Sequence, residues 1–262
     1  MNTMNMKRIL LCLLIGISYL FANAQGVVVY KKDGTKIKVP YEQLDSISTY
    51  GAGDEPDPSG HEWVDLGLPS GTLWATTNVG ASKPEEYGDY FAWGETVGYN
   101  GGNTTFGWNT YKYCSGSNKT IWKYCTESYF GTVDNKTMLE PVDDAATANW
   151  GEAWQMPSLD QFEELINSNY TSSEWVTING IYGKKITSKN NLKSIFLPAA
   201  GYRSGTYLHN VGNGGSYWSR SLSTSAPDYA FNLYFDSSSI YTHVYSRYYG
   251  RSVRPVRVQN TR

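Results

Sequence analysis

Cysteine and histidine are scarce in this sequence. The chain has three of each in 262 residues, and no Cys-x-x-Cys spacing occurs. The histidines, His61, His209 and His243, are scattered along the chain, whereas a structural zinc site takes four ligands that come in short-range pairs. The sequence therefore predicts no metal site and no cofactor.

Two of the cysteines, Cys114 and Cys125, lie in "YKYCSGSNKTIWKYC". Aromatic-rich runs on both sides of the Ser-Gly-Ser-Asn stretch indicate a hairpin that brings the two sulfurs together in an oxidising compartment. We predict a disulfide between them, worth about 3 kcal/mol in the chain-entropy treatment. Two free, half-buried thiols are the alternative.

Long apolar runs are also lacking, with one short exception near the start. A charged segment leads into an apolar run over 9–21, and Ala-Asn-Ala follows, ending at Ala24. This order is typical of a secretory signal peptide, so we predict a signal peptide over 1–24 with cleavage between Ala24 and Gln25. The run is too short to span a bilayer as a helix, and no later stretch is a transmembrane candidate. The mature protein is expected to be secreted or held at the cell surface.

The net charge is small, and the motifs of several common catalytic sites are missing. A formal charge of -2 argues against a general binder of nucleic acid or of membrane surfaces. No G-x-S-x-G, H-E-x-x-H or phosphate-loop motif is present. The paired carboxylates at 143–144 and 163–164 are interpreted as helix-start charge and as a solvated helix face. We therefore predict that the protein is not an enzyme.

Aromatic residues and glycine are abundant instead. The chain holds 22 Tyr, 9 Trp and 26 Gly, which indicates short strands and tight turns in an extracellular domain. "VVVYKKDGTKIKVP", residues 27–40, places two β-prone runs around Asp-Gly, a strong hairpin signal. Leu44 and Ile47, just after it, are expected to pack back onto the hairpin.

A compositional break divides the chain. Residues 51–60, "GAGDEPDPSG", are acidic and rich in Gly and Pro, which is typical of a linker. We predict a small β-hairpin segment over 25–50, this linker over 51–60, and one domain over 61–258. Two stretches of that domain are expected to be helical: 143–150, with acids at its start, and 158–168, where Ser158 and Gln161 form a capping box. The predicted class is α+β.

The C-terminal part of the chain loses two residue types. No Glu follows Glu174, no Lys follows Lys193, and residues 194–262 carry seven Arg against two Asp, a local charge of +5. Protein interfaces are depleted in Lys and Glu and enriched in Tyr, Trp and Arg, and antibody paratopes combine Tyr with Ser, Gly and Asn. This composition predicts a binding surface.

The alternation of apolar and polar residues along two strands predicts which side chains share that surface. Alternate residues from Phe231 to Phe235 and from Ile240 to Val244 are expected to face the core, so the residues between them share an outer face. If the two strands pair through the turn at 236–239, the outer faces merge. The predicted ligand-binding residues are Tyr217, Arg220, Tyr229, Asn232, Tyr234, Tyr241, His243, Tyr245, Arg247, Tyr248 and Arg251. The alternative is that the aromatics pack beneath loops and that Arg254 is a structural hydrogen-bond or ion-pair partner.

Six ordered blocks resemble a known family: "WVDLGLPSGTLWATTNVGA", "GDYFAWGET", "WGEAWQMPSLDQFEELI", "FLPAAGYR", "GGSYWSRS" and "GRSVRPV". They are similar to the major paralogous domain family first named from Fibrobacter and abundant in exported proteins of gut Bacteroidetes. The resemblance covers about 63–256. It implies a C-type-lectin-like fold, shared with the formylglycine-generating enzyme: two short helices on an irregular antiparallel sheet, with long loops, in an exported protein of a Gram-negative bacterium.

The chain lacks the functional motifs of two families that share this fold, which argues against their activities. The chain lacks the Glu-Pro-Asn or Gln-Pro-Asp and Trp-Asn-Asp motifs of calcium-dependent lectins, and no cysteine follows Cys125, whereas the formylglycine-generating enzyme uses a late pair. The segment from "GGSYWSRS" to "GRSVRPV" also resembles the variable region of retroelement-diversified proteins, in which surface positions become Tyr, Asn, Ser, Asp or His.

Taken together, these observations favour a surface-displayed binding protein that recognises an unknown protein or glycan ligand through Tyr and Arg, without a metal. A structural or fimbria-associated surface protein, with the hairpin as its assembly element, is the alternative. An enzyme of the formylglycine-generating-enzyme-like fold is the less favoured third interpretation.

Overall fold

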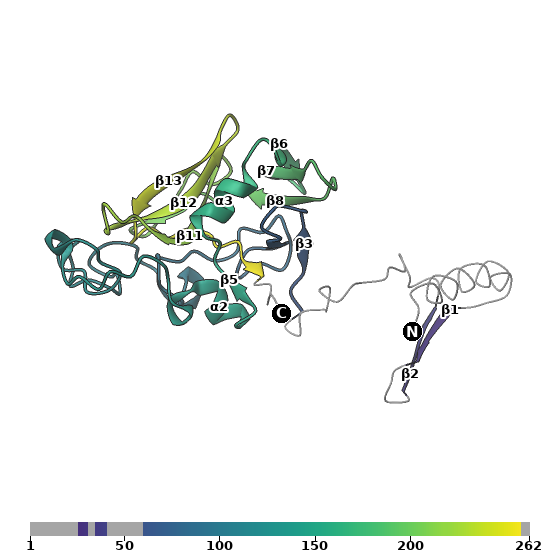
Figure 1. Cartoon of the computed structure of the whole chain (residues 1–262), viewed down its shortest axis with the longest axis horizontal. Helices are drawn as coiled ribbons and strands as arrows, with labels where there is room; N and C mark the ends of the chain where they lie inside the picture. The colour runs from purple at the N-terminus through teal and green to yellow at the C-terminus, as the bar shows by residue number, and fades with distance from the viewer. Residues whose placement is uncertain (1–25, 31–34, 41–59, 258–262) are drawn as a thin grey trace. The chain divides into compact units, whose positions relative to one another are not determined.

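The computed structural model describes residues 26–30, 35–40 and 60–257, and the chain divides into two compact units, Met1–Glu55 and Pro56–Arg262 (Figure 1). The predicted signal peptide and its cleavage site lie outside the described residues. So do Leu44, Ile47 and residues 51–59 of the predicted linker.

The first unit contains the predicted hairpin. Strands β1 (Gly26–Tyr30) and β2 (Lys36–Pro40) pair antiparallel, with Val28 opposite Lys38. Val28 and Ile37 are exposed on these strands. The pairing of the two β-prone runs is thereby confirmed.

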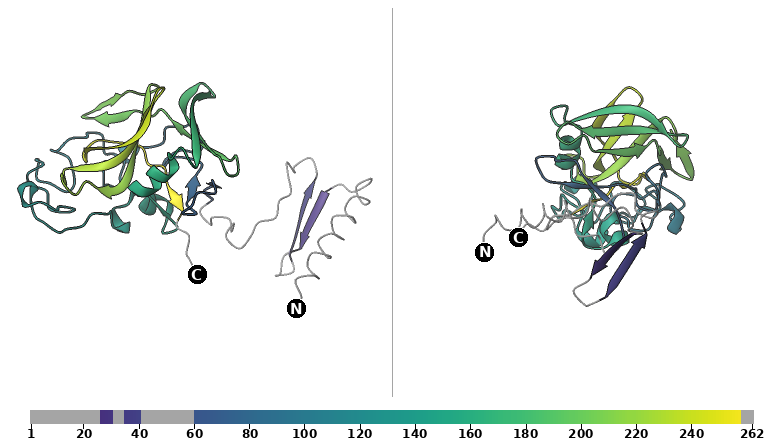
Figure 2. Two further views of the ribbon diagram at one scale, coloured as in Figure 1. Left: turned by 45° about the horizontal axis from the view of Figure 1, so that its top comes forward. Right: turned by 90° about the vertical axis from the view of Figure 1, so that its right-hand side faces the viewer.

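The second unit is built mainly from strands, with few and short helices, which is an α+β architecture. Its strands in chain order are β3 (Trp63–Asp65), β4 (Leu73–Ala75), β5 (Trp154–Gln155), β6 (Thr171–Ile178), β7 (Ile181–Ser188), β8 (Ser194–Pro198), β9 (Tyr202–Ser204), β10 (Tyr207–His209), β11 (Gly214–Leu222), β12 (Tyr229–Asp236), β13 (Ile240–Ser246) and β14 (Val256–Arg257). They form sheets in the orders β3-β4-β14-β5, β6-β7-β8, β9-β10 and β11-β12-β13. Figure 2 shows the green β6–β8 and the yellow-green β11–β13 as separate sheets.

The α-helices that the structure describes in the second unit begin at the caps that their sequences provide. In α3 (Leu159–Leu165) the Ser158 side chain accepts from the Gln161 backbone N–H, and the Gln161 side chain accepts from the Ser158 N–H, so the predicted capping box is confirmed. Helix α2 (Ala145–Trp150) begins later than predicted, because the Asp144 carboxylate is its N-cap while Asp143 still belongs to a short 3-10 helix.

The β11–β13 sheet has two different faces. Its inner face packs on α3 in a core cluster that includes Phe162, Leu165, Leu233 and Phe235. Adjacent residues of a strand point to opposite faces, so the neighbours of Leu233 and Phe235 point away from this core. The predicted alternation is therefore correct for Leu233 and Phe235, but Phe231 is only half-buried and Asn232, although on the outer face, is fully buried. The outer face is the one that carries the candidate site.

A second core cluster lies among the loops between β4 and β5, and it is largely aromatic. Loop carbonyls have no sheet partners here, and buried tyrosines satisfy several of them. The hydroxyl of Tyr90 donates to the Ala200 carbonyl at 2.7 Å, and that of Tyr111 to the Trp93 carbonyl at 2.8 Å. Much of the tyrosine content is thus explained by packing and hydrogen bonding of loops, as the alternative interpretation held.

The structure corrects the predicted disulfide. Cys114 and Cys125 are both free thiols. Cys114 Sγ lies 3.2 Å from the Trp108 carbonyl oxygen, and Cys125 Sγ lies 3.2 Å from that of Glu127. The flanking aromatic runs form turns that bury their rings in the aromatic cluster rather than a regular hairpin, so each sulfur faces a different carbonyl.

Within the described parts of the chain, no helix is long and apolar enough to cross a membrane.

Candidate binding site

The register of the β11–β13 sheet brings three polar aromatic side chains together on its outer face. Tyr234 in β12 lies directly opposite Tyr241 in β13, and Ser216 in β11 lies opposite Tyr234 on the other side. The rings of Tyr234 and Tyr241 are 5.4 Å apart, a contact distance for aromatic pairs. Tyr245, four residues after Tyr241, points to the same face.

The β9–β10 hairpin supplies a second wall. Its first strand carries Tyr202, and Asn210 follows its second strand. Two backbone hydrogen bonds between Arg203 and Gly250, at 2.7 and 3.0 Å, fix the hairpin to the segment after β13, where Tyr249 lies. The edge of the Tyr202 ring meets the Tyr249 ring with centroids 5.5 Å apart.

Arg251 comes up between the two walls. Its backbone N–H and carbonyl both bond to Phe91, at 3.0 and 2.9 Å, and the backbone of the next residue bonds to β11, which holds the segment beside that strand. Its Nη1 donates to Asn232 Oδ1 at 3.0 Å. Asn232 is itself held, because its amide nitrogen donates to the His243 carbonyl at 2.8 Å. The guanidinium is thereby aimed into the space between the walls.

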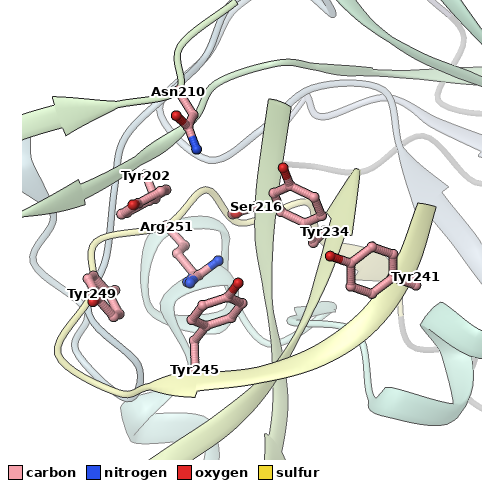
Figure 3. Close-up of a pocket in the computed structure, with 8 residues that line it drawn as sticks. All are labelled: Tyr202, Asn210, Ser216, Tyr234, Tyr241, Tyr245, Tyr249 and Arg251. Atoms are coloured by element: carbon pink, nitrogen blue, oxygen red, sulfur yellow. The ribbon is translucent and has the colours of Figure 1, made fainter. Parts of the chain in front are cut away.

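These groups enclose a cavity of about 170 Å³. It is lined by Tyr202, Asn210, Ser216, Tyr234, Tyr241, Tyr245, Tyr249 and Arg251. Figure 3 shows the Arg251 side chain lying between Tyr202 and Tyr249 on one side and the tyrosines of the sheet on the other. Tyr241, on the outermost strand, is 41% exposed and forms part of the rim.

The hydroxyls of four lining tyrosines are free to bind a ligand. Tyr202, Tyr234, Tyr241 and Tyr245 make no hydrogen bond through their hydroxyls within the described part of the chain. A phenol both donates and accepts, so the pocket offers several uncommitted hydrogen-bonding groups around one cation. Burial raises the pKa of Tyr234, and nearby Asp236 adds to the effect, so this hydroxyl stays protonated and able to donate.

The chemistry of the lining is that of phenols, an amide, a hydroxyl and one guanidinium. Within the ranges that the structure describes, no three His, Cys, Asp or Glu side chains gather so as to hold a metal. The lining contains no carboxylate, histidine or thiol. Its groups suit recognition by hydrogen bonds, stacking and charge.

The structure brings together part of the predicted set. Tyr234, Tyr241, Tyr245 and Arg251 line the pocket, and Asn232 supports Arg251 from below. His243 lies opposite Asn232 on the outer face, exposed and between the rings of its neighbours at 6.2 and 5.2 Å. It is outside the pocket lining.

Two predicted residues belong to the interior, which corrects the prediction. Tyr217 points to the inner face of β11 and is fully buried, and its hydroxyl donates to the Pro198 carbonyl at 2.7 Å. Arg247 is also fully buried, because the loop before β5 closes over it. Its donors reach the Tyr111 hydroxyl and the carbonyls of Lys123, Tyr124 and Pro227.

The remaining three predicted residues lie away from the pocket. Arg220 follows the register shift that begins after Trp218, and its Nη1 donates to Gln155 Oε1. Tyr229, at the far end of β12, lies opposite Ser246. Tyr248 is half-buried between Trp108 and Tyr249, at ring distances of 5.2 and 4.5 Å. Arg254 is a buried structural residue, as the alternative interpretation proposed.

Sequence reasoning missed four lining residues: Tyr202, Asn210, Ser216 and Tyr249. Ser216 had a detectable signal, because it alternates with the apolar-facing position 217 in "GGSYWSRS". Tyr202 and Asn210 lie on a hairpin whose position against β13 depends on contacts that no local pattern indicates.

Comparison with known proteins gives one match. A family described as a domain of unknown function, DUF8237, matches residues 166–256. This range contains every residue that lines the pocket. No curated protein and no solved structure matches the chain.

Proposed function

We propose that this protein is an exported binding protein, displayed at the surface of a Gram-negative bacterium, that takes part of a protein or glycan ligand into the tyrosine-lined pocket without a metal ion or a chemical reaction. The observation that carries the proposal is the group of uncommitted hydroxyls around Arg251 in a cavity of about 170 Å³. Rigid amphipathic tyrosines beside small polar residues are a recurrent solution for recognition surfaces.

We also propose a C-type-lectin-like fold and membership of the Bacteroidetes major paralogous domain family for the second unit. Two short helices, several small antiparallel sheets and the long loops between β4 and β5 support this proposal. Apart from Arg251, the pocket is lined by Tyr, Asn and Ser alone. That composition agrees with the resemblance to retroelement-diversified regions.

The test is binding of the purified chain to a glycan array and to host and bacterial surface extracts, with EDTA present. A Tyr234→Phe, Tyr241→Phe, Tyr245→Phe variant removes three hydroxyls and keeps the rings, so the sheet should fold normally. We expect the variant to lose binding, because a recognition site loses affinity when its hydrogen bonds are removed.

Tyr207→Phe is the matched control. Tyr207 lies in β10, is 72% exposed and is not part of the lining, so this variant should bind like the wild type. Equal binding by the wild type and the triple variant, or none by either, would show that the pocket is not a recognition site.

A structural surface protein is the second candidate, and one observation favours it. The hairpin β1–β2 has two strands, which is marginal in isolation, and it leaves Val28 and Ile37 exposed at 41% and 44%. Removal of residues 25–60 separates the two functions. Binding survives this truncation if the pocket is the functional site, whereas surface assembly fails if the hairpin is.

A further inference from the structure

The described residues include three fully buried arginines, and one of them differs from the other two. Arg247 donates four hydrogen bonds and Arg254 donates three, to carbonyl, amide and hydroxyl oxygens. Arg251 is 1% exposed and donates one hydrogen bond within the described part of the chain. Its Nε is buried with no partner among the described residues.

The surroundings of Arg251 hold the charge in place without neutralising it. The guanidinium carbon lies 4.3 Å from the ring centre of Tyr245 and 4.8 Å from that of Trp218, distances at which aromatic faces attract a cation. Burial lowers the pKa of Arg251 to about 10, against the opposing effect of Tyr245 and Tyr249. The side chain therefore still carries its positive charge at neutral pH.

No counterion for this charge lies in the pocket. The lining has no carboxylate, and Arg251 forms no ion pair with any residue that the structure describes. Asp236, in the turn after β12, uses its Oδ1 to accept from the N–H and hydroxyl groups of Ser238 and Ser239. A buried cation without a partner is costly, so its persistence at a cavity wall indicates that the partner comes from outside.

We propose that the pocket binds a sugar acid, with the Arg251 guanidinium pairing with the carboxylate and the lining tyrosine hydroxyls bonding to the ring hydroxyls. The inference rests on the function proposed above and names the ligand class for the same site. A guanidinium matches a planar carboxylate through parallel N–H donors.

The rest of the lining favours a saccharide over a simple inorganic anion. Several neutral groups that both donate and accept surround the single charge, and these complement a ligand with one carboxylate and several hydroxyls. The cavity of about 170 Å³ is smaller than a typical site for a drug-sized molecule, so it admits a single terminal sugar acid.

The experiment measures the affinity of the full chain for glucuronate, for glucuronamide and for inorganic sulfate by calorimetry. The amide has the same shape as the acid without its charge, so the comparison needs no variant. We expect glucuronate to bind more tightly than the amide by about ten-fold or more, because a charged hydrogen-bonded pair is lost. Sulfate should bind more weakly than glucuronate, because it lacks the ring hydroxyls.

Variants then assign the effect to Arg251. In Arg251→Met the preference for the acid over the amide should disappear, and in Arg251→Lys it should fall, since an ammonium lacks the planar fork. Arg257→Met is the control: Arg257 lies in β14 against the Trp63 ring, outside the pocket lining, and its variant should keep the preference.

Three outcomes overturn the inference: equal affinity for acid and amide, binding of neither probe in the millimolar range, or sulfate binding as tight as that of glucuronate. If the tyrosine triple variant loses binding to the array while acid and amide bind alike, the proposed function stands and the sugar-acid assignment fails. If the array shows no dependence on the tyrosines, both fail together.

Discussion

Tyrosine serves two purposes in this domain, and the partner of the hydroxyl separates them. Buried tyrosines such as Tyr111 and Tyr113 donate to backbone carbonyls of loops at 2.8 and 3.0 Å. They replace the hydrogen bonds that a strand would otherwise supply. Tyr202, Tyr234, Tyr241 and Tyr245 have hydroxyls with no such partner among the described residues. Composition alone cannot separate the two groups, because each tyrosine contributes equally to the count.

The buried arginines lead to a prediction at the residue scale. Arg247→Met should lower the free energy of unfolding by about 3 kcal/mol, because it leaves buried carbonyls without a donor. Arg251→Met should cost less, about 1 kcal/mol, because it removes a single hydrogen bond, to the Asn232 side chain, together with a buried charge that has no counterion. Urea denaturation of the two variants measures the difference. Equal losses would mean that Arg251 is a structural residue like Arg247.

The β9–β10 hairpin is the element on which the shape of the pocket depends. Gly201 begins it with φ +64, and a Cβ there would lie 1.9 Å from the His209 carbonyl oxygen and 2.7 Å from the Val211 nitrogen. No side chain fits in that position. The hairpin can place Tyr202 and Asn210 beside the sheet because residue 201 is glycine.

Gly201→Ala is therefore expected to weaken ligand binding and to lower the free energy of unfolding by about 1 to 3 kcal/mol. Gly205→Ala is the matched control, because Gly205 also has a positive φ, +56, but a Cβ added there would have no atom within 4 Å. The control carries the backbone strain without the clash. Similar binding by the two variants would show that the hairpin position does not shape the site.

The sequence specifies the elements here better than it specifies their packing. Alternation is local, and it was sufficient to place Tyr234 and Tyr241 on one face. The burial of Arg247 depends on a loop more than 100 residues away, through the carbonyls of Lys123 and Tyr124. No local pattern contains that contact. The disulfide prediction failed for a related reason. The two aromatic runs meet through the Trp122 N–H and the Tyr113 carbonyl at 3.0 Å, but the packing of their rings in the core leaves the two sulfurs facing different carbonyls.

At the scale of the whole domain, one carboxylate ties the long loops to the core. Asp143 accepts hydrogen bonds from Lys123 and from the Tyr124 hydroxyl, and Lys112 lies 3.3 Å away. Burial by itself would raise the pKa of this carboxyl, but the hydrogen bonds from Lys123 and Tyr124 outweigh it and hold the pKa at about 2. The folded domain therefore binds this proton less readily than the unfolded chain does.

The free energy of unfolding should therefore fall as the pH is lowered into the acid range. The contribution of Asp143 to the free energy of unfolding is complete above its ordinary pKa of 3.8 and is lost as the pH falls toward about 2. Asp143→Asn should cost about 1 to 2 kcal/mol at neutral pH, and the cost should shrink over that acid range. Denaturation of both proteins along a pH series checks this. Glu174→Gln, which removes an exposed pair with Lys185, should have little effect at any pH.

The position of strand β14 in its sheet affects the order in which the domain can fold. It is the last strand that the structure describes, yet it lies between β4 and β5, with Val256 opposite both Trp74 and Gln155. The middle of that sheet is missing until the ribosome has added these late residues. The domain is thus expected to close late and slowly, since pairings between distant segments carry a large entropic barrier. A chain cut a few residues short of Val256 would lose the strand that joins its two halves.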